Sequence, residues 1–159
     1  MSNDWQNDIR EMMKLYGQEV KSKPEIPDEK TLKLRAELCE EEFHEFLDGL
    51  GFRRDMDFCG GQWIMRKDPD YANPPDLVKL ADGIVDTIVV LLGTACAFGI
   101  DIQPLWDIIM ESNINKLIDG KLIKRNDGKI LKPSNWQPPK VCEELVRQGW
   151  NDNEKNKTD

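Results

Sequence analysis

Acidic residues in two separate stretches have the spacing of a metal site. In residues 34–48, Glu41, Glu42 and Glu45 continue a helical stripe that begins with two leucines, so an inward-facing stripe changes from apolar to carboxylate. Because a second apolar stripe follows the same expected helix, we expect it to be packed on both sides. Carboxylates in such a space resist ionising together unless a cation compensates them, and clustered oxygens suit a hard ion such as Mg²⁺.

The second stretch, residues 76–99, is apolar on every side and is typical of a helix in the middle of a bundle. Its acids beyond the first turn are Asp82 and Asp86, which lie on one face because they are spaced i, i+4. Helices joined by a loop usually pack antiparallel, so these aspartates can face the glutamates in a four-carboxylate cage. The alternative for the first stretch alone is a solvated acidic helix face.

The remaining segments predict an all-α fold, a four-helix-type bundle with a short C-terminal β-hairpin. Beside the two acidic helices, the first of which Asp28 can cap, helices are expected over residues 4–20, 104–117 and 141–148. The hairpin is expected over residues 121–131, where Asn126-Asp127-Gly128 is a strong turn signal. Residues 51–75 form a loop between the carboxylate helices whose role stays open.

Composition limits the function classes. The chain has 159 residues, a net charge of −8 and a pI near 4.8, which disfavours nucleic-acid binding. The apolar run 84–98 is short for a membrane span and is interrupted by an aspartate, and no signal peptide is recognised, so we expect a cytoplasmic protein without a membrane partner. One domain is predicted over residues 1–150, followed by a disordered tail over 151–159. The four cysteines lack the spacing of a zinc site.

Cationic and amide side chains near the C-terminus could bind phosphate. Asn113 and Lys116 share one helical face and offer an amide and an ammonium group to a phosphate or sugar. Lys124 and Lys132 belong to the most basic segment, around the expected hairpin. Those lysines could hold the pyrophosphate end of a nucleotide, or they could protect an exposed strand edge from aggregation. Lys116 by itself could equally be a solvated surface lysine.

These motifs resemble the MazG-like nucleotide pyrophosphohydrolases, a family of all-α NTP pyrophosphatases. The resemblance covers roughly residues 5–139 and is strongest in the block Glu41-Glu42-x-x-Glu45, in Asp82-x-x-x-Asp86 and in the segment 112–116. One position departs from the family pattern: residue 83, three before Asp86, is glycine instead of glutamate. Asp82 would then have to supply the fourth ligand.

The resemblance implies a function. It implies Mg²⁺-dependent hydrolysis of a (deoxy)nucleoside triphosphate between the α- and β-phosphates, giving the monophosphate and pyrophosphate; Mn²⁺ can take the place of Mg²⁺. Glu42, Glu45, Asp82 and Asp86 would hold the metal, and Glu41 would be a further ligand or the base that orients water. The partners implied are the nucleotide and copies of the same chain, in a homodimer or homotetramer.

The sequence also allows two alternative functions. A non-catalytic helical protein could use the acids to bind a regulatory metal or to stabilise an oligomer. A di-iron centre could use the E-x-x-H sequence that ends at His44, but that architecture needs the motif on two helices and the chain has one histidine.

Overall fold

The computed structural model describes residues 4–57, 62–67, 73–118 and 120–151. Within them the chain forms five helices and one two-stranded antiparallel sheet. The elements are α1 (Trp5–Leu15), α2 (Glu29–Gly49), β1 (Arg53–Asp57), β2 (Gln62–Arg66), α3 (Leu77–Phe98), α4 (Ile102–Ile114) and α5 (Val141–Arg147). They divide into two compact units, one of residues 1–20 and 26–98, the other of residues 21–25 and 99–159. The mostly helical fold confirms the predicted class, and one domain over 1–150 stays a prediction.

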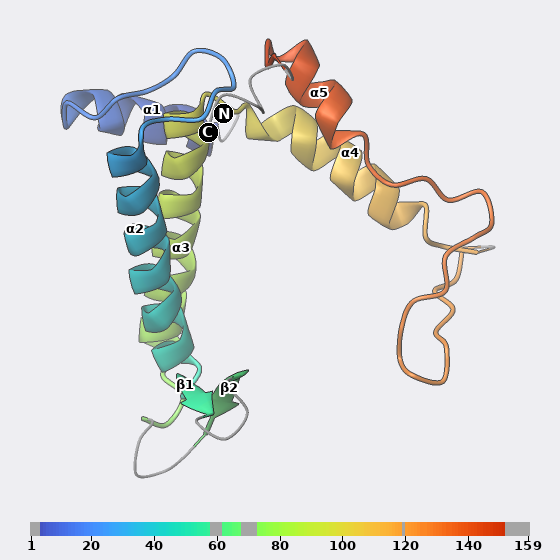
Figure 1. Cartoon of the computed structure of the whole chain (residues 1–159). Helices are drawn as coiled ribbons and strands as arrows, with labels where there is room; N and C mark the ends of the chain where they lie inside the picture. The colour runs from blue at the N-terminus through green and yellow to red at the C-terminus, as the bar shows by residue number, and fades with distance from the viewer. Residues whose placement is uncertain (1–3, 58–61, 68–72, 119, 152–159) are drawn as a thin grey trace. The chain divides into compact units, whose positions relative to one another are not determined.

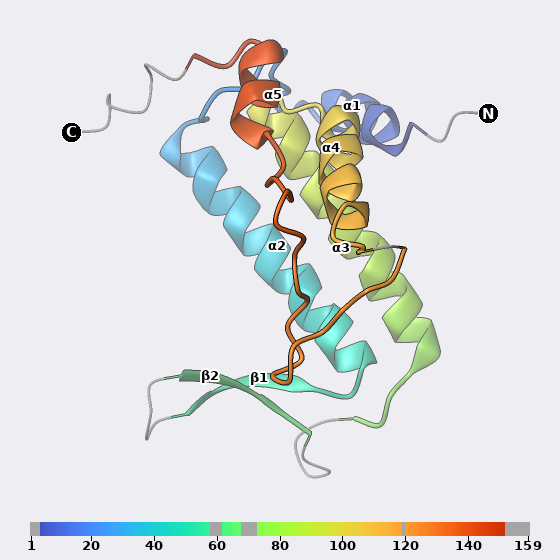
Figure 2. The same cartoon turned by 90° about the vertical axis from the view of Figure 1, so that its right-hand side faces the viewer.

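Helices α2 and α3 lie side by side and antiparallel in the first unit (Figures 1 and 2). Asp28 caps α2, its side chain accepting a hydrogen bond from the Thr31 amide at 2.8 Å, as the sequence predicted. The two helices approach closely at glycines. A Cβ on Gly49 would lie 2.6 Å from the Leu80 Cα, and one on Gly83 would lie 2.8 Å from the Phe46 Cα.

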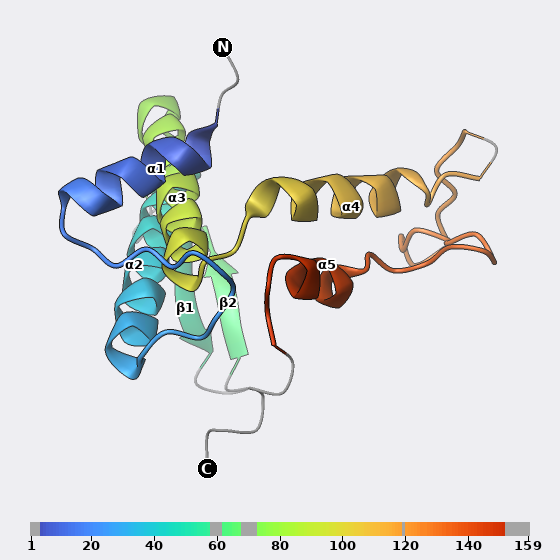
Figure 3. The same cartoon turned by 90° about the horizontal axis from the view of Figure 1, so that it is seen from above.

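The core of this unit lies where α1 crosses α3 (Figures 1 and 3). Ile9 and Met13 of α1 pack against Cys96 and Ala97 near the end of α3. The predicted helix over 4–20 is shorter in the structure, since α1 ends at Leu15.

A buried arginine borders this core. The Arg35 guanidinium of α2 donates to the Gln18 Oε1 at 3.0 Å, while its buried Nε has no hydrogen-bond partner among the residues that the structure describes. Burial lowers the pKa of Arg35, because the charged form loses hydration. Gly93 leaves room for this side chain: a Cβ there would lie 3.0 Å from the Arg35 Nη1.

Strands β1 and β2 form in the segment that the sequence suggested was a loop. They pair antiparallel from Arg53 opposite Arg66 to Asp57 opposite Gln62, at the end of the α2–α3 pair (Figure 2). Parts of the predicted loop, residues 58–61 and 68–72, lie outside the described residues. The described portion is therefore a hairpin appended to the two acidic helices.

The second unit contains α4 and α5. Asp101 caps α4, and the Gln148 side chain, just after α5, accepts from the Asp101 amide at 2.8 Å. The predicted helices over 104–117 and 141–148 are thus confirmed with small shifts of their ends.

The predicted C-terminal hairpin is present only in part. The turn at Asn126-Asp127-Gly128 forms, with the Gly128 amide donating to the Arg125 carbonyl at 2.9 Å, but the flanks pair through the single bridge between Lys124 and Ile130. The predicted tail lies outside the described residues from 152 onward.

Helix α3 keeps a large apolar surface. Its length and hydropathy would allow it to cross a membrane, and about a third of its most apolar window is buried within the chain. It packs against both α1 and α2 and carries two aspartates in its first half. Its central position in a four-helix bundle stays a prediction.

Candidate active site

The antiparallel register of α2 and α3 brings the acidic residues of both helices to the same level. Gly83 lies against the backbone of Phe46 and Glu45. One helical turn further along the pair, Glu42 of α2 and Asp86 of α3 come to matching positions. The acids of the two helices are therefore brought to one level of the pair, while the four-carboxylate cage stays a prediction.

The neighbouring acids act on the ionisation of Glu42. The pKa of the Glu42 carboxyl is raised, first by its partial burial and then by the negative charges of Asp86, Glu45, Glu41 and Asp82. All five predicted acids thus contribute to one region of negative potential. A divalent cation at this position would relieve the repulsion, and carboxylate oxygens are the ligands that Mg²⁺ prefers.

The cluster is more open than the sequence suggested. Glu42 and Asp86 are half-buried, whereas Glu41, Glu45 and Asp82 are exposed. Within the first unit α2 is not packed on both sides, contrary to the expectation, because Leu34 and Phe43 are 42% and 37% exposed. Among the described residues, no three His, Cys, Asp or Glu side chains are arranged as a metal site. The donor types fit Mg²⁺, and the side chains would have to turn inward to hold it.

Gly83 has a structural reason to depart from the family pattern. Its Cα faces the α2 backbone so closely that any side chain would collide with Phe46. A glutamate at this position could not be accommodated at this helix spacing. Asp82 and Asp86, on either side of this contact, are the acids that α3 can offer to α2.

The predicted phosphate-binding residues lie in the second unit. The Lys116 ammonium donates to the Asn113 Oδ1 at 2.6 Å and lies 5.9 Å from the centre of the Trp136 ring. The Lys132 ammonium lies over the same ring at 3.6 Å, and the Trp136 indole donates to the Ser112 carbonyl at 2.9 Å. The structure thus groups three of the four predicted residues around one tryptophan.

Lys124 stands apart from that group, on the bridge to Ile130. The role of all four residues in binding a nucleotide stays a prediction.

Comparison with known families decides the relationship. A family model described as phosphoribosyl-ATP pyrophosphohydrolase matches residues 9–113, more than half of the chain. The chain belongs to that family. No curated protein matches it.

The family lies within the MazG-like all-α NTP pyrophosphatases, so the resemblance stated from the motifs is confirmed. Membership makes the chain a pyrophosphohydrolase, a hydrolase that acts on phosphoric anhydride bonds. The matched region contains the five acids of the cluster and ends at Asn113, before the three predicted lysines. The acid cluster is therefore the part of the candidate site that the family relationship covers.

Proposed function

We propose that this protein is a Mg²⁺-dependent pyrophosphohydrolase that cleaves a (deoxy)nucleoside triphosphate between its α- and β-phosphates. Water adds to phosphorus, the anhydride bond breaks, and a nucleoside monophosphate and pyrophosphate leave. The observation that carries the proposal is the cluster of carboxylates around Glu42, because its raised pKa marks a place where negative charge needs a cation. Family membership supplies the reaction type.

Each acid has a role in this proposal. Glu42, Glu45, Asp82 and Asp86 would hold Mg²⁺, with Mn²⁺ as a substitute. When bound, such an ion polarises phosphate oxygens and makes a water molecule more acidic. Glu41 accepts a hydrogen bond from the attacking water and orients it, or adds a further ligand.

The second unit would bind the charged part of the substrate. Lys116 and Lys132 carry cations beside an aromatic ring, and Asn113 adds an amide. A charge-assisted bond from such a lysine to a phosphate oxygen is worth about 1.5–3 kcal/mol.

The test is a panel of the eight common nucleoside triphosphates together with phosphoribosyl-ATP, each with Mg²⁺, with Mn²⁺ and with EDTA. Metal-dependent release of pyrophosphate from any of them supports the proposal, and the best substrate sets the specificity. If the best substrate is phosphoribosyl-ATP, the name of the family describes this chain as well. No release from any of them favours the alternative, a non-catalytic metal-binding or oligomeric helical protein.

We further propose that the protein works in the cytoplasm as a homodimer or homotetramer. Support for the assembly comes from α3, which has long apolar side chains exposed along its length, including Leu77, Ile84 and Leu91. A second copy would cover them and would also enclose the open acid cluster.

A further inference from the structure

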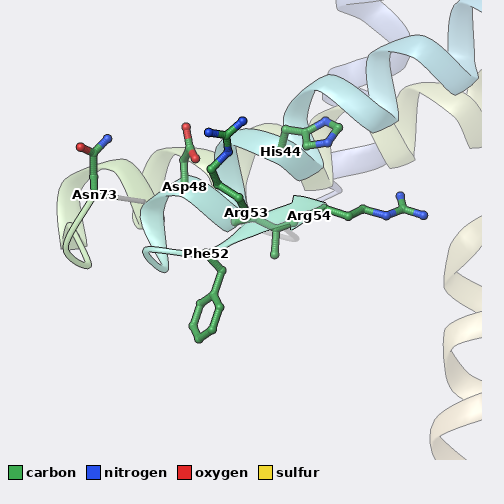
Figure 4. Close-up of a pocket in the computed structure, with 7 residues that line it drawn as sticks. His44, Asp48, Phe52, Arg53, Arg54 and Asn73 are labelled. Atoms are coloured by element: carbon green, nitrogen blue, oxygen red, sulfur yellow. The ribbon is translucent and has the colours of Figure 1, made fainter. Parts of the chain in front are cut away.

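The positive charges around Trp136 converge on one ring, unlike those at the end of α2. The cavity of about 340 Å³ at the end of α2 is bordered by Arg53 and Arg54. These arginines are consecutive on β1 and leave opposite faces of the hairpin, and Figure 4 shows them projecting in different directions. In the second unit, by contrast, the ammonium groups of Lys116 and Lys132 lie near the same aromatic ring.

A tight turn brings Lys132 and Trp136 together. The Trp136 amide donates to the Pro133 carbonyl at 3.0 Å, which closes a turn over residues 133–136. The central residues of the turn, Ser134-Asn135, are of types that favour turns. Lys132 directly precedes the turn, and its ammonium lies 3.6 Å from the centre of the Trp136 ring. The local sequence therefore places this lysine beside the tryptophan.

Two hydrogen bonds fasten the Trp136 segment to the end of α4. The Trp136 indole donates to the Ser112 carbonyl at 2.9 Å, and the Ser112 hydroxyl donates to the Gln137 carbonyl at 3.2 Å. The Ser112 carbonyl lies in the last turn of α4, where carbonyls lack a donor within the helix. Ser112 is buried, so both bonds are partly shielded from competing water. The ring is thus restrained beside the helix end.

The same helix end supplies the second cation. Lys116 follows α4, and its ammonium lies 5.9 Å from the centre of the Trp136 ring while donating to the Asn113 Oδ1 at 2.6 Å. Both ammonium groups are within the range of a cation–π contact, about 6 Å from the ring centre. Trp136 therefore holds two like charges near each other, and an anion that contacts both would relieve their repulsion.

Neither lysine is neutralised by an acid that the structure describes. Elsewhere in this unit an exposed lysine, Lys140, pairs with Glu143. Lys116 and Lys132 form no such ion pair among the described residues, although the whole chain carries −8. Two cations that a ring holds close, and that no described acid neutralises, make a place for an anion.

We propose that Trp136 is a positioning residue, which holds Lys116 and Lys132 as one site for two consecutive phosphate groups. Each ammonium donates to a different phosphate, so two linked phosphates gain a charge-assisted bond that a single phosphate does not make. In the proposed function these phosphates belong to the hydrolysed nucleotide, and in that respect the site rests on that function. Binding itself needs neither metal nor hydrolysis.

The test is calorimetric titration of inorganic pyrophosphate and of inorganic phosphate into the full chain in EDTA. We expect pyrophosphate to bind at least about tenfold more tightly than phosphate, the scale of one charge-assisted bond. Trp136→Leu should remove this preference, whereas Trp136→Phe, which keeps a ring, should retain most of it. The control is Lys129→Gln, which removes an exposed cation of the same unit and should leave the preference unchanged.

A double-mutant cycle separates positioning from a general structural role. In the background Lys132→Gln, Trp136→Leu should lose far less pyrophosphate affinity than in the wild type, because one cation no longer has to be held beside another. An equal loss in both backgrounds overturns the proposal, since Trp136 then contacts the ligand itself or supports the fold.

The lysine variants protect the test against misfolding of the tryptophan variant. Lys116→Gln and Lys132→Gln, each alone, should remove the preference for pyrophosphate, because the site needs both cations. A wild type that binds the two anions equally, or lysine variants that keep the preference, would show that the two lysines do not form one site.

The hydrolysis assay separates this site from the proposed function. If no nucleotide is hydrolysed while the preference for pyrophosphate depends on Trp136 and both lysines, the site stands and the function fails. If a nucleotide is hydrolysed with the same KM by wild type and Trp136→Leu, and this variant keeps the preference, the function stands and the site fails.

Discussion

The acid cluster should affect the stability of the protein through the ionisation of Glu42. Its pKa is raised by partial burial and by four neighbouring carboxylates. A carboxyl whose pKa is higher in the folded protein contributes stability below the unfolded value, near 4.3, and that contribution is lost as pH rises through the folded value. We expect metal-free Glu42→Gln to be at least as stable as wild type at pH 7, with the advantage disappearing below about pH 4.

Thermal melts in EDTA between pH 4 and 8 measure this difference. The control is Glu37→Gln, an exposed acid of α2 that lies 3.6 Å from the Lys33 ammonium and outside the cluster. A stability gain of the same size and pH dependence in both variants would mean that general charge reduction, and not the cluster, is responsible.

Asp86 distinguishes a metal site from a structural acid. Asp86→Asn keeps the shape and removes one negative charge, so we expect unchanged or higher stability in EDTA, a smaller stabilisation by millimolar Mg²⁺ and loss of nearly all hydrolysis. Melts with EDTA and with Mg²⁺, together with a pyrophosphate assay, check all three. A variant that melts lower in EDTA by about 1–3 kcal/mol and responds to Mg²⁺ as wild type does would identify Asp86 as a structural hydrogen-bond acceptor.

Lys116 tests the contribution of the second unit. Its ammonium bonds to Asn113 at 2.6 Å near the end of α4, outside any buried core. We expect Lys116→Ala to fold normally and to lower kcat/KM by about tenfold to a hundredfold, the value of one charge-assisted bond to phosphate. Lys140→Ala, which removes an exposed lysine paired with Glu143, is the control. Equal kinetics in the two variants would remove Lys116 from the site.

For individual residues, the sequence gives a stronger signal for the grouping of the acids than for the grouping of the cations. Asp82 and Asp86 share a helix face because of their i, i+4 spacing, wherever the helix begins and ends. The antiparallel pairing of α2 and α3 was expected because helices joined by a loop usually pack that way. Trp136 gathers lysines that are far apart in sequence, which only the folded segment shows.

Helices α2 and α3 depend on glycines for their close approach. A methyl group on Gly83 would lie 2.8 Å from the Phe46 Cα, and backbone atoms cannot yield as a side chain can. We expect Gly83→Ala to cost about 1–3 kcal/mol in the free energy of unfolding, measured by urea denaturation, despite the better helix propensity of alanine. It should also weaken Mg²⁺ binding, because the helices that carry the acids move apart.

Gly93→Ala is the matched comparison on the same helix. The added Cβ would lie 3.0 Å from the Arg35 Nη1, the end of a flexible side chain that can shift. Its cost should therefore be smaller than that of Gly83→Ala. The reverse order would show that the helices can adjust at Gly83 and that Arg35 is the more rigid contact.

The elements of the fold were predictable where their signals are local. Asp28 and Asp101 cap their helices through short-range hydrogen bonds that follow from residue type and position. Strand β1, with the sequence RRDMD, lacks the β-branched and aromatic residues that identify strands, and its pairing with β2 overrides that preference. The turn at Gly128 was recognised, but its flanks do not pair far enough to make strands.

At the scale of the whole molecule, the apolar surface of α3 exceeds what the first unit covers. Leu77, Ile84 and Leu91 are 79%, 42% and 53% exposed and recur every seven residues, the spacing of a seam between packed helices. Val78 and Val85 follow the same period on the neighbouring stripe. Exposing such a surface to water is unfavourable, and a partner helix would cover it. A second copy of the chain is the partner that our proposal names.

We therefore expect light scattering at micromolar concentration to give a multiple of the 18.4 kDa chain mass. Ile84→Glu/Leu91→Glu places charges on the seam and should shift the mass toward that of one chain, since burying an unpaired charge is unfavourable. Leu15→Glu, at a position 86% exposed on α1, is the control and should leave the mass unchanged. A wild-type protein with the mass of one chain would refute the assembly, and the seam would then have to be covered within the chain itself. If the assembly dissociates in the charged variant while hydrolysis persists, the acid cluster is complete in one chain.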